Sequence, residues 1–232
     1  MSYKTELHCH TKRVSACGKA TPEYVIERYL AAGYSSIVLT NHMNASTFTS
    51  DRYYEYLAER GAEDSWSVRI DYYMDDYNRM VTAARGQMDV ILGLELRLIS
   101  DSINDYLIYG VSEEWLRNSE CFNYMKIDEL SEYVRKSGLL IYQAHPFRNG
   151  MTVVNPNLLD GYEIYNGNTG HDSRNNIAEE WAKKYEKLAI SGSDFHRAEH
   201  SINAGIITES PITNNDELLN VLRSQNYQII KG

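Results

Sequence analysis

Histidine and acidic residues are grouped at a few points of this 232-residue chain, and such side chains are suited to binding divalent metals. His8 and His10 are two residues apart, so in an extended strand their imidazoles lie on the same face. Asp194 and His196 repeat this spacing late in the chain. Each pair supplies half of a metal site, although a single His-x-His motif is weak evidence by itself.

Three further residues of these types adjoin apolar runs that are typical of buried strands. His42 and His145 each follow such a run, and Glu95 lies within one. In barrels and open α/β sheets, functional groups gather at the carboxyl ends of parallel strands. We therefore expect five imidazoles and two carboxylates to converge. Because such a cluster is unfavourable without a cation at its centre, the sequence predicts a site for two or three divalent metals.

Each of these residues also has a simpler explanation when it is taken alone. A single histidine after a strand is more often a hydrogen-bonded loop residue than a ligand. Asp194 could cap a helix, and Glu95 could form a buried ion pair with Arg97 or Arg148. If these explanations were all correct, each residue would have to lie at a strand end independently of the others. A shared metal cluster is therefore the favoured interpretation.

The elements that must position these residues alternate along the chain. Local signals predict helices from Pro22, after the capping Thr21, to the residue before Gly33, and over residues 127–136 and 214–224. The alternation predicts parallel strands with right-handed crossovers, in a closed barrel or an open doubly wound sheet. After the first strand, which ends at the His-x-His pair, the expected strands are 35–40, 90–96, 106–111, 139–143, 161–165, 187–191 and 204–208.

The segment 43–88 is longer than a simple crossover needs. Its tyrosine-rich and acidic stretches, residues 51–59 and 71–77, predict two additional helices that could form a lid. No low-complexity linker divides the chain, so we expect a single domain over residues 1–232 with an inserted helical segment at 43–88.

Composition narrows the classes of function. Lys and Arg number 23 against 32 Asp and Glu, and a net charge of −9 argues against stable nucleic-acid binding. Three cysteines do not form a disulfide framework. The sequence shows neither a signal-peptide apolar region nor an apolar run of about 20 residues, so we expect a soluble, cytoplasmic protein without membrane contact. The oligomeric state is left open.

Six motifs occur in a fixed order from residue 6 to about residue 197. They are E-L-H-C-H at 6–10, T-x-H at 40–42, G-x-E at 93–95, A-H-P at 144–146, E-x-Y-N-G at 163–167 and G-S-D-x-H at 192–196. Their combination resembles the polymerase and histidinol phosphatase (PHP) superfamily. The resemblance implies an α/β fold, a distorted (β/α)7 TIM-like barrel with a trinuclear metal centre in its mouth.

The resemblance also implies how the ligands are shared among three metals. Imidazole and carboxylate ligands are compatible with zinc, manganese or iron. Four of these ligands, His8, His10, Glu95 and Asp194, are the implied catalytic residues. The first metal would be bound by His8, His10, Glu95 and Asp194, the second by Glu95 and His145, and the third by His42 and His196.

The chain departs from the family pattern at three positions. Cys17 stands near the place of a metal-binding Asp, so its thiolate is either a ligand of the third metal or a buried structural thiol. Asn41 replaces the Asp that usually precedes the histidine of the second motif. A histidine seen in some members on the strand after Glu95 is absent, and Asp105 is the nearest substitute.

These features predict a hydrolase that cleaves a small phosphomonoester through a metal-activated hydroxide. Arg97, Arg148 and Arg197 are expected to hold the phosphate by bidentate contacts, with solvent-facing side chains as the alternative. Asn166 and Asn168 are expected to support the site or contact the substrate. The competing hypotheses are a non-catalytic metal-binding module and an exonuclease that acts on nucleic-acid ends.

Overall fold

The computed structural model describes residues 2–101, 103–120 and 122–232 and has an α/β architecture. The strands are β1 (Tyr3–Cys9), β2 (Ser36–Leu39), β3 (His42–Met43), β4 (Asp89–Leu92), β5 (Leu94–Leu96), β6 (Tyr106–Tyr109), β7 (Leu140–Gln143), β8 (Gly161–Asn166), β9 (Leu188–Gly192), β10 (Ala204–Thr208) and β11 (Gln228–Lys231). The α-helices are α1 (Pro22–Ala31), α2 (Asp51–Arg60), α3 (Trp66–Ala84), α4 (Glu113–Arg117), α5 (Ile127–Lys136), α6 (Asn175–Lys184) and α7 (Asn215–Ser224).

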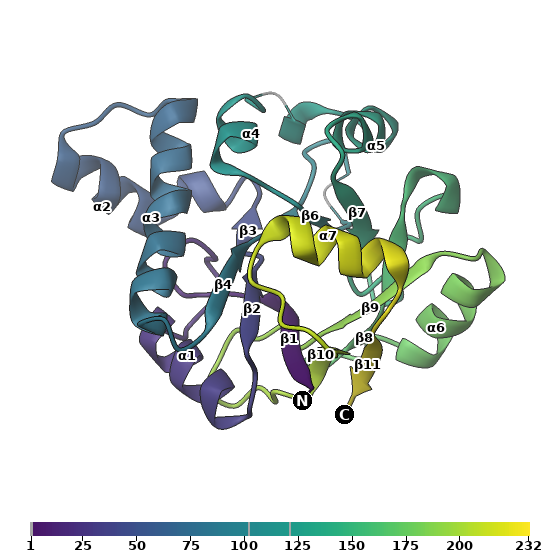
Figure 1. Ribbon diagram of the computed structural model, residues 1–232. Helices are drawn as coiled ribbons and strands as arrows, with labels where there is room; N and C mark the ends of the chain where they lie inside the picture. The colour runs from purple at the N-terminus through teal and green to yellow at the C-terminus, as the bar shows by residue number, and fades with distance from the viewer. Residues whose placement is uncertain (1, 102, 121) are drawn as a thin grey trace.

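The strands form two sheets that close into a distorted barrel (Figure 1). One sheet has the order β11-β10-β1-β2-β4, and the other has the order β3-β5-β6-β7-β8-β9. The chain passes directly from β2 to β3 and from β4 to β5, which joins the sheets on one side. On the other side, a bridge between Cys9 and Phe195 joins the end of β1 to the segment after β9. The predicted α/β barrel is confirmed.

The prediction that the strands are all parallel is wrong at two places. Strand β6 is antiparallel to both β5 and β7, and β10 is antiparallel to both β1 and β11. The described residues between β5 and β6, 97–101 and 103–105, contain no helix to carry the chain back, so a short connection makes β6 run in the opposite direction. The amino end of β6 therefore lies beside the carboxyl ends of its neighbours.

The strand predicted over residues 90–96 is interrupted at Gly93, where the chain crosses from one sheet to the other. A side chain at this position would have its Cβ 2.6 Å from Val38 Cγ1, so the close approach requires glycine. Beyond the break, β5 pairs with β3, and Glu95 lies directly opposite His42. The interruption thus brings Glu95 next to a predicted ligand from a different strand.

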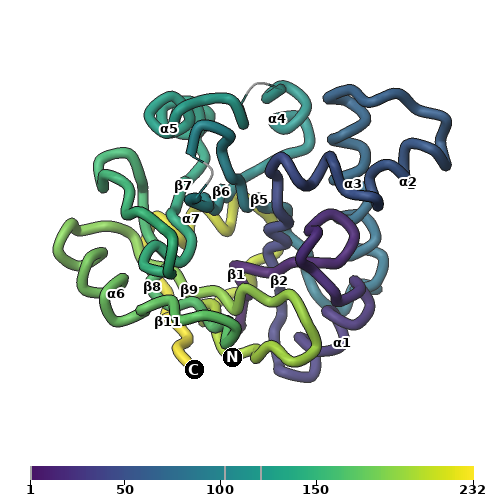
Figure 2. Tube along the Cα trace, turned by 180° about the vertical axis from the view of Figure 1, so that it is seen from behind, coloured from purple at the N-terminus to yellow at the C-terminus, as the bar shows by residue number. Residues whose placement is uncertain are grey.

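Helices surround the barrel, with α2 and α3 on one side and α6 on the opposite side (Figure 1; Figure 2). The predicted helices are present: Thr21 caps α1 and Asn214 caps α7 through their side chains, and α5 spans Ile127–Lys136 as expected. The two additional helices expected within residues 43–88 are α2, which covers 51–59, and α3, which contains 71–77 and extends beyond it at both ends. Helices α4 and α6 and strand β11 were not predicted. No helix of the described residues has the length and apolar character that a bilayer span requires.

Several tyrosines are fully buried and bind the backbone with their hydroxyl groups. Tyr73, on α3, donates to the carbonyl oxygens of Asn41 and Gly93, at the points where two strands cross between the sheets. Tyr109, on β6, donates to the carbonyl oxygen of Leu7. These bonds hold the backbone beside the predicted ligands in place.

Gly192, at the end of β9, packs directly against His8. A Cβ at this position would overlap the Cβ of His8 and lie 2.8 Å from Glu163 Oε1. We expect Gly192→Ala to lower the free energy of unfolding by about 1–3 kcal/mol, because added volume strains a packed interior. Gly170→Ala, which meets only the end of the Asn168 side chain, is the control and should change stability by less than about 0.5 kcal/mol. Equal urea midpoints for both variants would contradict this account.

Candidate metal centre

The structure brings seven of the predicted ligands into one cluster inside the mouth of the barrel. They come from the carboxyl ends of β1, β7 and β9 and from β3 and β5. The most exposed of them, His42, has 13% of its side chain exposed. Four overlapping groups of side chains have donor atoms close enough to share a metal ion. The predicted members of the cluster are His8, His10, His42, Glu95, His145, Asp194 and His196.

Two imidazoles and two carboxylates converge at the end of β1. The Nε2 atom of His8 is 3.4 Å from Glu95 Oε1 and 3.4 Å from Asp194 Oδ1. The Nε2 atom of His10 is 3.3 Å from Glu95 Oε2 and 3.4 Å from Asp194 Oδ1. Both nitrogen atoms and both Glu95 oxygens are buried without a hydrogen-bond partner in the described part of the chain. Such unpartnered donors fit a divalent cation.

Glu95 also faces a second group, which contains the residue just before β6. His145 Nε2 is 3.3 Å from Glu95 Oε1, and it lies 3.9 Å from Asp105 Oδ2. Asp105 immediately precedes β6, and it reaches the site because β6 is antiparallel to its neighbours. Glu95, Asp105 and His145 thus have the geometry of a second metal-binding group.

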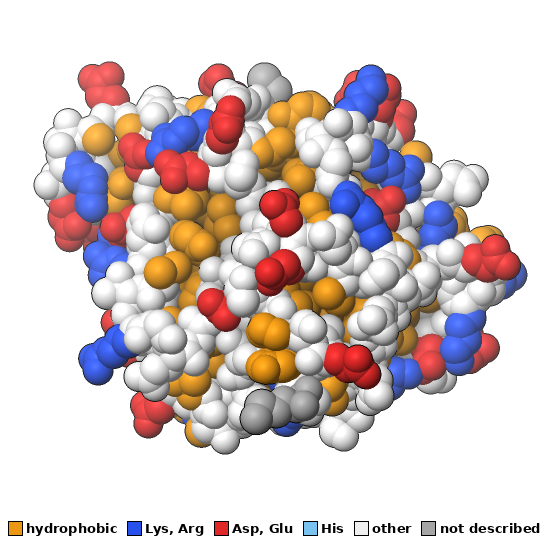
Figure 3. Space-filling view, in the orientation of Figure 1, with side chains coloured by type: hydrophobic (Ala, Val, Ile, Leu, Met, Phe, Trp, Pro, Cys, Tyr) orange, Lys and Arg blue, Asp and Glu red, His pale blue; other side chains and the backbone are white. Residues whose placement is uncertain are grey.

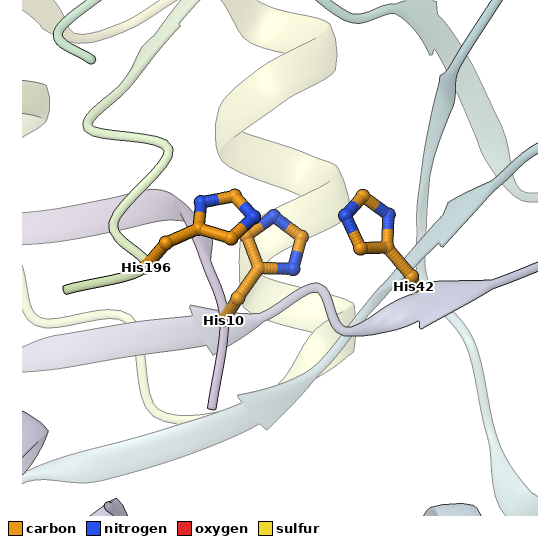
Figure 4. A group of neighbouring side chains, drawn as sticks. All are labelled: His10, His42 and His196. Atoms are coloured by element: carbon orange, nitrogen blue, oxygen red, sulfur yellow. The ribbon is translucent and has the colours of Figure 1, made fainter. Parts of the chain in front are cut away.

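His10, His42 and His196 form a third group, and Figure 4 shows the three rings together. The ring centroid of His10 is 4.4 Å from that of His42 and 4.1 Å from that of His196. Cys17 belongs to none of the candidate metal-binding groups of the described residues. It lines the cavity beside this group as an exposed residue, so the alternative of a buried structural thiol is wrong. Desolvation of the thiol would raise its pKa, but hydrogen bonds from His196 and His42 outweigh this effect and lower the pKa of Cys17 to about 6.

The charges of the cluster favour a cation. Burial would raise the pKa of Glu95, but attraction to His42 and His8 holds that pKa well below its usual value. Burial would lower the pKa of His8, yet Glu163, Asp194 and Glu95 raise it well above its ordinary value. A proton on His8 therefore balances the carboxylates in the absence of metal. The pKa of His10 is instead lowered by burial and by the neighbouring His196 and His42.

Two of the predicted ligands have positive φ angles, a backbone conformation that is unfavourable for residues with a side chain. His145 has a φ of 29° and Asp194 has a φ of 48°. Such conformations cost on the order of 1–3 kcal/mol each and persist only where surrounding contacts hold them. At His145, the backbone N–H donates to Glu163 Oε2 at 2.8 Å.

Two buried glutamates that we did not assign a role orient the ligands. Glu163, on β8, accepts hydrogen bonds from His8 Nδ1 (2.9 Å) and Asn166 Nδ2 (2.9 Å) as well as from His145. Glu6, on β1, accepts from the backbone N–H groups of His8 and Ser193, both at 2.8 Å. Burial raises the pKa of Glu6 to about 7. Both glutamates belong to the quoted motifs. Glu6 precedes His8 by two residues and Glu163 lies on a different strand, so their burial around the ligands can be recognised only in the folded structure.

A cavity of about 490 Å³ opens above the cluster and is lined by three arginines. Arg97 donates to both oxygens of Asp105 at 2.7 and 2.6 Å, and Arg148 donates to Asp105 Oδ2 at 3.3 Å. The alternative in which Glu95 pairs with Arg97 or Arg148 is therefore wrong, because both arginines bind Asp105. Arg197 is exposed, and its guanidinium group forms no ion pair within the described residues.

The two asparagines after β8 have different places. Asn166 does not line the cavity, and it is buried against Glu163. Asn168 lines the cavity and donates to the backbone oxygen of Asp194 at 3.2 Å. His171 lines it as well, with its Nε2 atom 3.4 Å from Asp194 Oδ2. His171 belongs to none of the six motifs, so no pattern in the sequence predicted its position.

We expect metal binding to strengthen as the pH rises. The metal-free protein holds a proton on His8 up to a pH well above the ordinary histidine value, and a metal must displace this proton. Calorimetric titration of the chelated protein with Mn²⁺ at about pH 6 and pH 8, in buffers of different ionisation enthalpy, should show proton release and weaker binding at the lower pH. His8→Asn should release fewer protons. Equal affinities without proton release would rule out this electrostatic account.

Comparison with known proteins gives the family of the chain. The model of the PHP domain matches residues 6–220. A candidate metal-dependent phosphoesterase from Bifidobacterium adolescentis is 15% identical, with a TM-score of 0.51 over 95% of this chain and 96% of that chain. An amidohydrolase from Chromobacterium violaceum, with bound sulfate and no metal, is 15% identical, with a TM-score of 0.51 over 97% of this chain and 98% of that chain.

The lesion-specific endonuclease PfuEndoQ from Pyrococcus furiosus is 14% identical, with a TM-score of 0.56 over 99% of this chain and 58% of that chain. No protein with a curated description matches the sequence. At these identities the solved structures show a shared fold alone. The family match, by contrast, spans nearly the whole barrel and contains every predicted ligand. This chain belongs to the PHP family.

Proposed function

We propose that this PHP-family metal-dependent phosphoesterase hydrolyses a small phosphomonoester. The observation that supports this proposal is the cavity of about 490 Å³, which has the imidazole and carboxylate cluster at its base and arginines in its wall. Its volume lies in the range of small-ligand sites. A phosphate group that enters it meets guanidinium groups and the cluster together.

The side chains of the cluster are suited to hold two or three divalent metals, among which zinc, manganese and iron fit the ligand types. When bound, such cations ionise a water molecule near neutral pH and offset the negative charge of a phosphoryl group. Glu95 faces two of the groups and is the residue that would be shared between them. Cys17 lies beside the third group in contact with His196 and His42, and its thiolate would favour zinc there if it joins the ligands.

The arginines have different roles in this proposal. Arg97 directs its Nε and Nη2 atoms at Asp105, so it stabilises that carboxylate and keeps only its remaining N–H groups for a substrate. Arg148 is held in a similar way. Arg197 has its whole guanidinium group available for a bidentate contact with phosphate. Asn168, in the same cavity, can donate to a phosphate oxygen.

We expect activity with Mn²⁺ on small phosphomonoesters such as p-nitrophenyl phosphate. His10→Ala and Asp194→Ala should lower kcat/KM by about 100-fold or more, because each removes part of the charge stabilisation of the transition state. Glu179→Gln, at a surface ion pair with Lys231, is the control and should retain activity. A fully metallated wild-type protein without turnover on phosphomonoesters or phosphodiesters would instead identify a non-catalytic metal-binding module.

Arg197→Ala should raise KM by about 10-fold and change kcat less, because a charge-assisted hydrogen bond to the substrate phosphate is lost. Arg79→Ala is a matched control, since Arg79 lies on α3 in an exposed ion pair with Asp75. Steady-state kinetics of the two variants provide the measurement. An unchanged KM for Arg197→Ala would exclude Arg197 from phosphate binding.

Hydrolysis at nucleic-acid ends is a second candidate, because an endonuclease shares the fold over 99% of this chain. The charge of −9 counts against a long polyanionic substrate, and on the one face that Figure 3 draws, acidic and basic side chains are interspersed. Hydrolysis of a 5′-labelled oligonucleotide at several salt concentrations discriminates between the two. Turnover of the oligonucleotide that exceeds turnover of the phosphomonoester would replace our first proposal.

A further inference from the structure

A buried carboxylate on α3, Asp76, lies close to the site without belonging to the metal-binding cluster. Its side chain is fully buried, and none of the candidate metal-binding groups among the described residues includes it. Burial of an acid is unfavourable unless hydrogen bonds compensate. The partners of Asp76 therefore indicate what this residue does.

Asp76 fixes the orientation of the Asn41 amide. Its Oδ2 atom accepts hydrogen bonds from Asn41 Nδ2 at 2.9 Å and from the hydroxyl of Thr11. Because a carboxylate only accepts, the amino group of Asn41 must face Asp76. The amide oxygen then faces the opposite way and accepts from the backbone N–H of Thr11 at 2.9 Å. Because that N–H group only donates, it must face the oxygen atom of the Asn41 amide. The contacts at the two ends of the amide therefore require the same orientation.

The orientation of Asn41 in turn determines where the hydroxyl proton of Ser15 goes. Ser15 Oγ donates to Asn41 Oδ1 at 2.9 Å, which uses its single proton. The backbone N–H of His42 donates to Ser15 Oγ at 3.0 Å. The remaining contact, 3.1 Å from Ser15 Oγ to His10 Nδ1, must then have His10 as the donor.

A proton on Nδ1 leaves the lone pair of a neutral imidazole on Nε2. In His10 this is the unpartnered atom that faces Glu95 and Asp194. Asp76, Asn41, Ser15 and His10 are all buried, so bulk water does not compete at any step. The ring of His8 is oriented directly by a carboxylate, because its Nδ1 atom contacts Glu163 and its Nε2 atom therefore faces Glu95 and Asp194.

We propose that Asp76 is a positioning residue that acts through Asn41 and Ser15 to hold His10 in the tautomer whose Nε2 atom binds metal. The proposal rests on the function above only in taking His10 as a ligand. It also accounts for the uncharged Asn41: the carboxylate that orients this ligand comes from α3, outside the barrel strands.

The wild-type protein provides a first test that involves no catalysis. Long-range ¹H–¹⁵N spectra of chelated protein labelled at histidine report which nitrogen carries the proton, and His10→Asn assigns the His10 signals. We expect the Nδ1-protonated tautomer for His10. A proton on Nε2, or no preference, would overturn the proposal, whereas a lack of phosphoesterase activity would leave this result unaffected.

Variants of Asp76 provide the second test. Asp76→Ala removes the acceptor of the Asn41 amino group and leaves only the Thr11 N–H to orient the amide, so the tautomer preference of His10 should weaken and Mn²⁺ affinity should fall by about 10-fold or more. Asp76→Asn can present an acceptor oxygen in the same place and should stay within about 3-fold of wild type. Asp71→Ala, on the same helix in an exposed ion pair with Arg117, is the matched control and should change neither.

Each outcome for a folded variant bears on the proposal. Wild-type tautomer and affinity in Asp76→Ala would overturn it, and so would an Asp76→Asn protein as impaired as Asp76→Ala. If Asp76→Ala does not fold, Ser15→Ala interrupts the same chain of hydrogen bonds with Asp76 intact. An unchanged His10 tautomer in Ser15→Ala would then overturn the proposal.

Discussion

The structure depends on one buried carboxylate that is surrounded by imidazoles. Glu95 lies 2.7 Å from a nitrogen atom of His42, 3.3 Å from nitrogen atoms of His10 and His145, and 3.4 Å from one of His8. Such a concentration of polar groups is unfavourable in a protein interior unless protons or cations balance it. The barrel assembles it by bringing several strand ends to a single point, and hydrogen bonds at Nδ1 orient the rings of His8, His10 and His196.

The sequence predicted the parts of the fold that local chemistry determines. The cap at Thr21 and the apolar side of residues 214–224 predicted two helices, and ligand-type residues beside apolar runs predicted the cluster. The break at Gly93 was missed because it depends on the approach of Val38, far away in the sequence. The antiparallel direction of β6 was missed because it depends on a short loop between strands.

In the candidate site, too, the features that local sequence determines were predicted and those that depend on long-range contacts were not. Residue types and spacing placed His8, His10 and Asp194 in the cluster, but the role of Glu163 depends on the pairing of β8 with β9 and on its contact with His8. Two of the three arginines that we expected at the phosphate are held by Asp105, and no motif contains these contacts. Ion pairs that form when separate segments fold together have no local signature in a sequence.

The positive φ angles of two ligands limit which residues can occupy these positions. Glycine would relieve the backbone but supplies no donor atom. Aspartate tolerates left-handed geometry better than most residues, so position 194 combines both demands with little conflict. Histidine shares some of that tolerance, but its bulkier ring leaves position 145 more dependent on its neighbours. There the Glu163 carboxylate, more than the intrinsic preference of the residue, keeps the main chain in its unusual shape.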